Sequence, residues 1–145
     1  MGVEITIDLA NSADRLKSIF EVRRQVFVEE QEVSEEEEYD DFETSSTHLR
    51  AIVNGQVVGT CRYRNTDKGI KLERFAVLKE NRRDGVGAAL VLKVLEIIDM
   101  SQYIYLHAQI QVVDFYTKYG FVQEGEQFEE AGIQHYKMVF RPEAT

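Results

Sequence analysis

A loop between a strand and a helix in the middle of the chain holds residue types that suit anion binding. An apolar strand pattern covers residues 72–78 and a helical pattern covers residues 88–100, with Gly85 and Gly87 just before that helix. Such a unit points backbone N–H groups and the positive end of a helix dipole at one place, which favours a phosphate or pyrophosphate. The turn also carries three basic side chains, Lys79, Arg82 and Arg83.

The glycine spacing excludes two common phosphate-binding motifs. Leu90 stands where a dinucleotide fingerprint requires Gly or Ala, and no Gly-Lys-Ser/Thr follows the loop as it would in a P-loop. Cations at a helix start are unfavourable for the helix dipole unless an anion neutralises them, which favours a ligand over a merely flexible loop. On the two glycines alone, both interpretations stay open.

The negative charge of the chain is concentrated in one segment. The formal net charge is −9, and residues 29–43 (the acidic segment) contain ten acidic and no basic residues. With those ten removed from the 26 acidic residues of the chain, 16 remain against 17 basic ones, so the remainder is nearly neutral. Nucleic-acid binding depends on clustered lysine and arginine, and a nucleic-acid partner is therefore not expected.

The length of 145 residues and the composition predict one globular domain over residues 1–145. No apolar run approaches the roughly 20 residues that span a bilayer. The one cysteine, Cys61, excludes an internal disulfide, and the N-terminal residues lack the features of a signal peptide. A cytoplasmic protein without a membrane partner is expected.

Hydrophobic periodicity predicts an α/β protein with a single mixed, mostly antiparallel sheet flanked by helices, in the order β-α-β-β-β-α-β-α-β-β. Asn54-Gly55 is a strong hairpin signal. The strand–helix–strand unit around Gly85 should join parallel strands by a right-handed crossover. Strands are predicted at residues 3–8, 48–53, 57–63, 70–78, 103–110, 121–128 and 133–140, and helices after Asn11 or Ser12, at 88–100 and at 112–119.

Several motifs together resemble the GNAT superfamily of acyl-CoA N-acyltransferases. RRDGVG (residues 82–87) matches its Arg/Gln-x-x-Gly-x-Gly/Ala loop, and LERFAVLKENRR resembles its fourth strand. DFYTKYGF (residues 114–121) resembles its FY-x-K-x-GF helix and strand. VRRQVFVEEQ, AQIQVVDFY and AGIQHYKM resemble a bacterial subgroup of uncharacterised GNAT acetyltransferases. The element order is also that of the superfamily, so the resemblance covers most of the chain.

The resemblance implies an enzyme that moves an acetyl group from acetyl-CoA to a primary amine by direct transfer. Acetyl-CoA would lie where the fourth and fifth strands splay apart, with its pantetheine arm along Phe75, Ala76 and Val77 as a pseudo-strand. Its pyrophosphate would contact backbone N–H groups of a loop made by Arg82, Arg83, Asp84, Gly85, Val86 and Gly87. A CoA-binding regulatory module without transfer activity is the alternative.

Direct transfer needs a neutral amine and a proton for the departing thiolate. A lysine-like amine of pKa ~10.4 is only about one part in 2500 neutral at pH 7, so a base helps. Tyr116 matches the family tyrosine that points at the CoA sulfur, and it is predicted to be the acid. Glu73, on the same side of its strand as Phe75 and Val77, is predicted to be the base, with its pKa raised toward neutrality. The alternatives are aromatic packing for Tyr116 and a salt bridge for Glu73.

Other residues are weaker candidates for the site. His107 titrates in the useful range for a base, and Tyr119 is a second candidate for the acid. Cys61 is expected to be a buried thiol and not a nucleophile, and the three histidines are too scattered for a metal signature. Further residues are predicted to line the acceptor pocket, namely His48, His135, Arg23 and Gln31.

The acidic segment allows two interpretations. Runs of like charge are usually solvated, partly mobile loops. Alternatively, the segment forms a rim that attracts a cationic acceptor such as a polyamine, an amino sugar or a protein lysine. The predicted partner is a small amine-bearing acceptor, and a homodimer is among the open alternatives.

Overall fold

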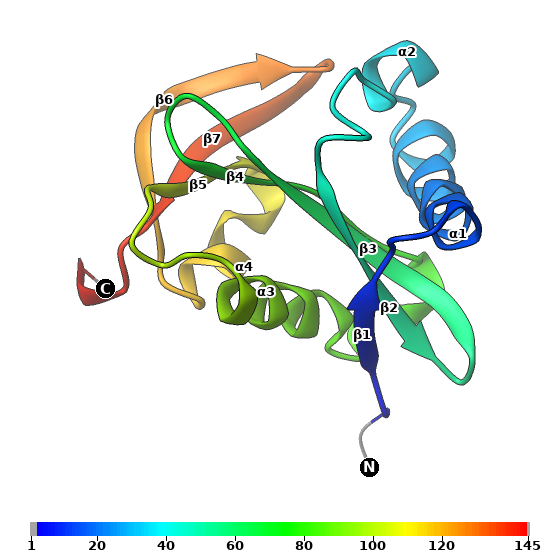
Figure 1. Cartoon of the computed structure of the whole chain (residues 1–145). Coiled ribbons are helices and arrows are strands. Elements are labelled where there is room, and N and C mark those ends of the chain that lie inside the picture. Colours follow the sequence, from blue (N-terminus) through cyan, green and yellow to red (C-terminus); the bar gives the residue numbers. More distant parts are fainter. Residues whose placement is uncertain (1–2, 145) are drawn as a thin grey trace.

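A computed structural model describes residues 3–144, which form a seven-stranded sheet with helices on both faces (Figure 1). The strands are β1 (Thr6–Leu9), β2 (Thr47–Val53), β3 (Gln56–Asn65), β4 (Ile70–Val77), β5 (Ile104–Gln109), β6 (Phe121–Glu130) and β7 (Ile133–Phe140). The α-helices are α1 (Ala13–Arg23), α2 (Glu35–Glu38), α3 (Val86–Ile97) and α4 (Val113–Thr117). A π-helical segment (Arg24–Glu30) continues α1, and short 3₁₀ turns cover Lys79–Asn81, Ile110–Val112 and Pro142–Ala144.

The sheet has the strand order β1-β2-β3-β4-β5-β7-β6. β4 and β5 are parallel and are joined through α3, whereas the other neighbouring strands are antiparallel. This confirms the predicted mixed, mostly antiparallel sheet. Local turn chemistry supports the hairpins, because Asn54 and Gly55 (φ 51° and 78°) take the positive φ that a two-residue β-turn requires.

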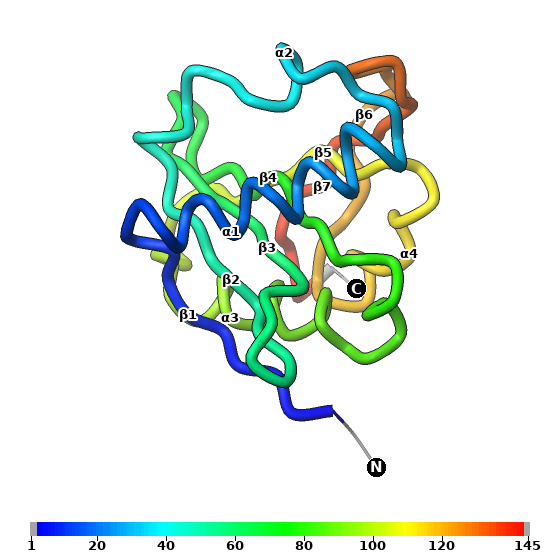
Figure 2. The backbone as a smooth tube through the Cα atoms, turned by 90° about the vertical axis from the view of Figure 1, so that its right-hand side faces the viewer, coloured from blue at the N-terminus to red at the C-terminus, as the bar shows by residue number. Residues whose placement is uncertain are grey.

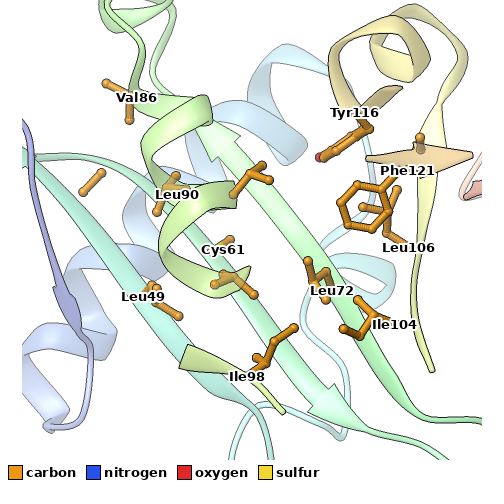
Figure 3. Close-up of a cluster of buried hydrophobic side chains, with 14 of the residues drawn as sticks. Leu49, Cys61, Leu72, Val86, Leu90, Ile98, Ile104, Leu106, Tyr116 and Phe121 are labelled. Carbon is orange, nitrogen blue, oxygen red and sulfur yellow. The ribbon is translucent and has the colours of Figure 1, made fainter. Parts of the chain in front are cut away.

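Two apolar cores cover the two faces of the sheet. On one face Leu90, Val91 and Val94 of α3 are fully buried and pack in a cluster that includes Leu72 and Cys61 (Figure 3). α1 crosses the other face (Figures 1 and 2). There a smaller cluster joins residues of α1, the π-helical segment, the loop that follows it and β4, namely Val22, Val26, Phe27, Val33 and Ala76.

The predicted elements are present, and their boundaries shift for local reasons. α3 begins at Val86, two residues before the predicted start, because Gly85 (φ 86°) already turns the chain into the helix. It ends at Ile97, before the predicted residue 100, because the Asp99 carboxylate accepts hydrogen bonds from Ser101 and closes a turn. None of the helices in residues 3–144 is long and apolar enough to cross a bilayer.

Candidate active site

The cleft opens where β4 and β5 stop pairing. Their parallel ladder joins only residues 70–72 with residues 104–106. Beyond it, β4 stays paired with β3 and β5 continues against β7. Arg74 has a positive φ of 59°, and the β3–β4 register shifts between Thr60 and Arg62, so a bulge bends β4 at this point. Among the described residues, the β5-facing edge of β4 after Leu72 therefore lacks a ladder partner.

A cavity of about 1010 Å³ fills this opening and passes between the two faces of the sheet. One half is lined by the glycine loop, α3 and α4. The other half is lined by α2, the acidic segment and the tip of the β6–β7 hairpin, which lie at the same end of the molecule (Figures 1 and 2). The lining includes most of the residues predicted to bind CoA or to transfer protons, namely Glu73, Phe75, Ala76, Val77, Arg82, Arg83, Gly85, Val86, Gly87 and Tyr116.

The glycine loop presents the start of α3 to the cavity. The first α-helical hydrogen bond runs from the Ala89 N–H to the Gly85 carbonyl, 3.0 Å away, and no side chain caps the helix. The N–H groups of Val86 and Gly87 therefore precede the helical ladder and can bind an anion. Asp84 is exposed and, unlike the other five residues of the predicted loop, does not line the cavity.

The two loop glycines are needed for different reasons. A Cβ on Gly85 would meet open space, so its constraint is the backbone angle of φ 86° and not crowding. A Cβ on Gly87 would lie 3.4 Å from the Phe115 ring of α4. Of the two positions, only Gly87 would bring an added side chain against another residue, whereas a side chain at Gly85 would enter the cavity.

The basic residues of the loop differ in whether they already form ion pairs within the protein. Arg82 forms a two-fold ion pair with Glu30 (Nη1–Oε2 2.6 Å, Nη2–Oε1 2.7 Å) and donates to the Val77 carbonyl. Glu30 therefore already supplies the anion that the sequence led us to expect for Arg82. Within residues 3–144, Arg83 and Lys118 line the cavity without an ion pair and remain available to a phosphate.

Tyr116 lies at the junction of the two halves of the cavity. Its ring is 7% exposed and packs edge-on against Phe75, Phe115 and Phe121, at centroid distances of 5.7, 5.1 and 6.0 Å. Its hydroxyl has no hydrogen-bond partner among the described residues. Burial raises the pKa of Tyr116 above its ordinary value of 10.0, so the hydroxyl is protonated at neutral pH and can donate.

The prediction that the pKa of Glu73 is raised is wrong. Burial alone would raise it, but three neighbouring cations lower the pKa of Glu73 to about 2. Oε1 accepts from Arg64 Nε at 2.7 Å and from Arg62 Nη2 at 3.0 Å, and Oε2 lies 3.1 Å from Lys71 Nζ. Both oxygens are engaged, so this carboxylate positions cations and is a poor proton acceptor as it stands. The salt-bridge alternative describes Glu73 better.

The acidic segment is tied to the sheet by buried arginines and is not simply a solvated loop. Arg62 has no exposed surface and pairs with Asp40 (2.7 Å) and Glu43 (2.9 Å). Arg23, also fully buried, binds Glu38 and Glu43 at 2.7 and 2.8 Å. The three most buried acids of the segment thus neutralise arginines, while Glu35, Glu36 and Glu37 stay exposed.

His107 stands at the splay, one residue beyond the last β4–β5 pair, and lines the cavity. Its Nδ1 is 3.0 Å from Oε2 of Glu130, and its ring meets Phe128 edge-on at 4.9 Å. The hydrogen bond with His107 lowers the pKa of Glu130, which keeps that carboxylate ionised. A neutral His107 ring that donates from Nδ1 to this carboxylate leaves Nε2 as a hydrogen-bond acceptor.

The remaining candidates divide into cavity residues and core residues. His135, Gln31 and Tyr119 line the cavity, as does Gln109, which donates to Gln31 at 2.9 Å. Arg23 and His48 do not line it, contrary to prediction, because both are buried beneath the acidic segment. Cys61 is 1% exposed and burial raises its pKa, so it is the inert core thiol that was expected.

Sequence reasoning missed the partners of Glu73. Arg62, Arg64 and Lys71 alternate with apolar residues on neighbouring strands, and that alternation places them on the face opposite α3. The sequence contains both the strand cations and the acidic segment that they could pair with. Neither the cations nor the acidic segment alone indicates these ion pairs, because the register of β3 and β4 decides which residues meet.

The chain belongs to the GNAT family. A family model described as "Acetyltransferase (GNAT) domain" matches residues 11–142. The uncharacterised N-acetyltransferase YjcF of Bacillus subtilis is 41% identical over 136 residues, which cover 90% of this chain and 96% of YjcF. The family assignment supports acyl-CoA-dependent N-acyltransferase activity and agrees with the predicted resemblance.

Solved structures show the same fold. The crystal structure of Escherichia coli ElaA is 26% identical with a TM-score of 0.79, covering 94% of this chain and 99% of that one. A GNAT acetyltransferase from Elizabethkingia anophelis, crystallised with acetyl-CoA bound, has a TM-score of 0.65 at 18% identity and covers 93% of this chain and 94% of its own. The latter likeness concerns the fold alone.

Proposed function

We propose that the protein is an N-acetyltransferase that moves the acetyl group of acetyl-CoA directly to a primary amine. One observation carries this proposal. A single cavity joins the splayed edge of β4, the uncapped start of α3 and Tyr116, and its lining also includes Lys71, Glu73 and His107 beyond the splay. A donor on one side and an acceptor on the other can therefore meet at the splay.

Acetyl-CoA fits the α3 side of this cavity. Its pyrophosphate would accept hydrogen bonds from the N–H groups of residues 82–87, with Arg83 and Lys118 as free cations nearby. Its pantetheine arm would pair with the open edge of β4 at Phe75, Ala76 and Val77. The name of YjcF, an uncharacterised N-acetyltransferase, supports acetyl-CoA among the acyl-CoAs.

The proton transfers can be assigned to residues that face the splay. The amine arrives as an ammonium ion and gives one proton to Nε2 of His107, which later returns it to solvent. The neutral nitrogen then attacks the thioester carbonyl, so that a C–N bond forms and the C–S bond breaks. Tyr116 donates its proton to the departing thiolate and regains one from the new amide nitrogen through water. One ammonium ion and one acetyl-CoA thus give an amide, CoA thiol and one released proton.

Glu73 has a supporting role in this scheme. Its carboxylate holds Arg62, Arg64 and Lys71 in place at the floor of the acceptor side. With a pKa of about 2 it stays ionised throughout the neutral range and does not exchange protons with the amine.

Turnover with a panel of amines tests the proposal. The full-length protein is incubated with acetyl-CoA and each amine. Free CoA thiol is measured with a colorimetric thiol reagent, and the acetylated amine is measured by mass spectrometry. We expect thiol and acetylated amine to appear in equal amounts. Tight CoA binding without turnover of any amine would contradict the enzyme and would favour the CoA-binding module.

A further inference from the structure

The ion-pair network at the floor of the acceptor side carries one more positive than negative charge. Within residues 3–144 its ion pairs form a closed set, apart from a 3.9 Å approach of His48 to Glu43. Burial lowers the pKa of His48 and keeps it neutral. The cations are Arg23, Arg62, Arg64, Lys71 and Arg74, and the carboxylates are Glu38, Asp40, Glu43 and Glu73.

The surplus charge lies beside Glu73. Arg23, Arg62 and Arg74 each contact at least two carboxylates. Among the described residues, Arg64 and Lys71 form ion pairs only with Glu73, which they share with Arg62, and Arg64 also stacks over the Phe42 ring at 3.8 Å. Their side chains are only 16% and 13% exposed, so water replaces the missing partner poorly. A nearly buried charge of this kind is costly unless another group pairs with it.

Both under-paired cations line the cavity close to His107. Lys71 is in register with Tyr105, and His107 follows two residues further along β5, a rise of about 7 Å. Glu130 also lines the cavity and interacts electrostatically with Lys71, but among the described residues its ion-pair partner is His107, at 3.0 Å, and not Lys71. An anion that enters the acceptor side would therefore find Lys71 and Arg64 next to the position of the reacting amine.

We propose that the acceptor is a primary amine that carries a carboxylate or another small anionic group a few bonds away, bound by Lys71 and Arg64. The anion would bring the network to neutrality while the amine lies at Nε2 of His107. This inference rests on the proposed function, because it names the substrate class of the same site. A purely cationic acceptor is disfavoured, because the carboxylates that would attract it, Glu38, Asp40 and Glu43, already form ion pairs with arginines.

Binding to the CoA-loaded, full-length protein tests the anion site by calorimetry. The ligands are ω-amino acids from glycine to 6-aminohexanoate, each with the matched amine that lacks the carboxylate. Phosphoethanolamine and ethanolamine are the matched pair that tests a phosphate in place of the carboxylate (the phosphate arm), and putrescine tests a purely cationic ligand. We expect at least one anionic member to bind about 10- to 100-fold tighter than its match, as charge-assisted hydrogen bonds predict. A preference confined to the phosphate arm would support the site and identify phosphate as the anion.

Two variants make the test specific. Lys71→Met should reduce the ratio of the Kd of the matched amine to the Kd of the anionic ligand to within a few-fold of one. Lys71→Arg should retain most of the wild-type ratio. Lys137→Met is the control, because Lys137 lies on β7, the strand next to β5, carries the same charge and does not line the cavity. Equal binding of every matched pair, tightest binding of putrescine, or an equal loss in Lys137→Met would overturn the proposal.

Thiol release with the same ligands separates this inference from the proposed function. Tight binding of an amino acid that is never acetylated would count against the acetyltransferase and would leave the anion site standing. Acetylation of butylamine and 4-aminobutyrate with equal kcat/KM, together with equal binding, would refute the anion site and would leave the acetyltransferase standing.

Discussion

Replacing Glu73 with glutamine should destabilise the protein strongly at neutral pH. The change removes one charge while the side-chain shape is kept, and it leaves Lys71 and Arg64 without an ion pair among the described residues. A fall in pKa from 4.5 to about 2 corresponds to roughly 3 kcal/mol of folding free energy. Loss of one partner of a buried ion pair costs about 3–5 kcal/mol in general. The two magnitudes agree on a loss of about 3 kcal/mol.

The pH dependence of this loss has a definite sign. Because the pKa of Glu73 is lower in the folded than in the unfolded state, its contribution is complete above about pH 4.5 and disappears as the pH falls toward 2. The free energy of unfolding of wild type should therefore exceed that of Glu73→Gln by about 3 kcal/mol at pH 7, and the difference should shrink below pH 4.5.

Urea unfolding followed by far-ultraviolet circular dichroism measures both quantities, at pH 7 and in steps down to pH 3. Glu126→Gln is the control, because Glu126 is exposed and has no ion pair among residues 3–144. A loss below 1 kcal/mol at pH 7 would refute the interpretation of Glu73 as the counter-ion of the network. A difference between wild type and variant that stays constant down to pH 3 would refute it as well.

Three further changes test the catalytic side. Tyr116→Phe should lower kcat about 10²-fold with the Kd for CoA within two-fold of wild type, because only the proton donor is lost; equal kcat would dismiss Tyr116 as the acid. Gly85→Trp should raise the Kd for CoA at least 10-fold, since the indole would enter the cavity. Gly125→Trp should not raise it, because Gly125 has a similar φ of 83° and open space around it but lies outside the cavity. Equal Kd values for the two variants would show that the loop is not part of the CoA site. Glu130→Gln should lower kcat/KM about 10-fold by releasing His107 Nδ1, while Glu129→Gln, the adjacent exposed residue, should leave it unchanged.

Much of the fold could be predicted because its signals are local. Asn54-Gly55 determines a hairpin through its own backbone angles, and the apolar stripe of α3 requires a sheet to cover it. The two glycines alone left the loop open to two interpretations, and the neighbouring cations and the resemblance to the GNAT superfamily favoured a ligand site; in the structure both glycines line the cavity. The element boundaries depended on single residues such as Gly85 and Asp99, whose roles emerge only with the backbone angles and hydrogen bonds.

The electrostatics of the site could not be predicted in the same way. The pKa of Glu73 depends on Arg62 and Arg64, which lie on another strand, and on a bulge at Arg74 that shifts the register. The acidic segment looked like a solvated run because its arginine partners are distant in sequence: Arg23 precedes it and Arg62 follows it. Likewise, nothing near His107 in the sequence indicates Glu130, which comes from the far end of β6.

A crystal structure of the full-length protein with acetyl-CoA would decide whether the β4–β5 splay is the donor site. We expect the pyrophosphate on the N–H groups of residues 82–87, the pantetheine arm along Phe75, Ala76 and Val77, and the thioester sulfur within hydrogen-bonding reach of the Tyr116 hydroxyl. Acetyl-CoA bound outside the β4–β5 splay, or a sulfur that does not face Tyr116, would contradict this expectation.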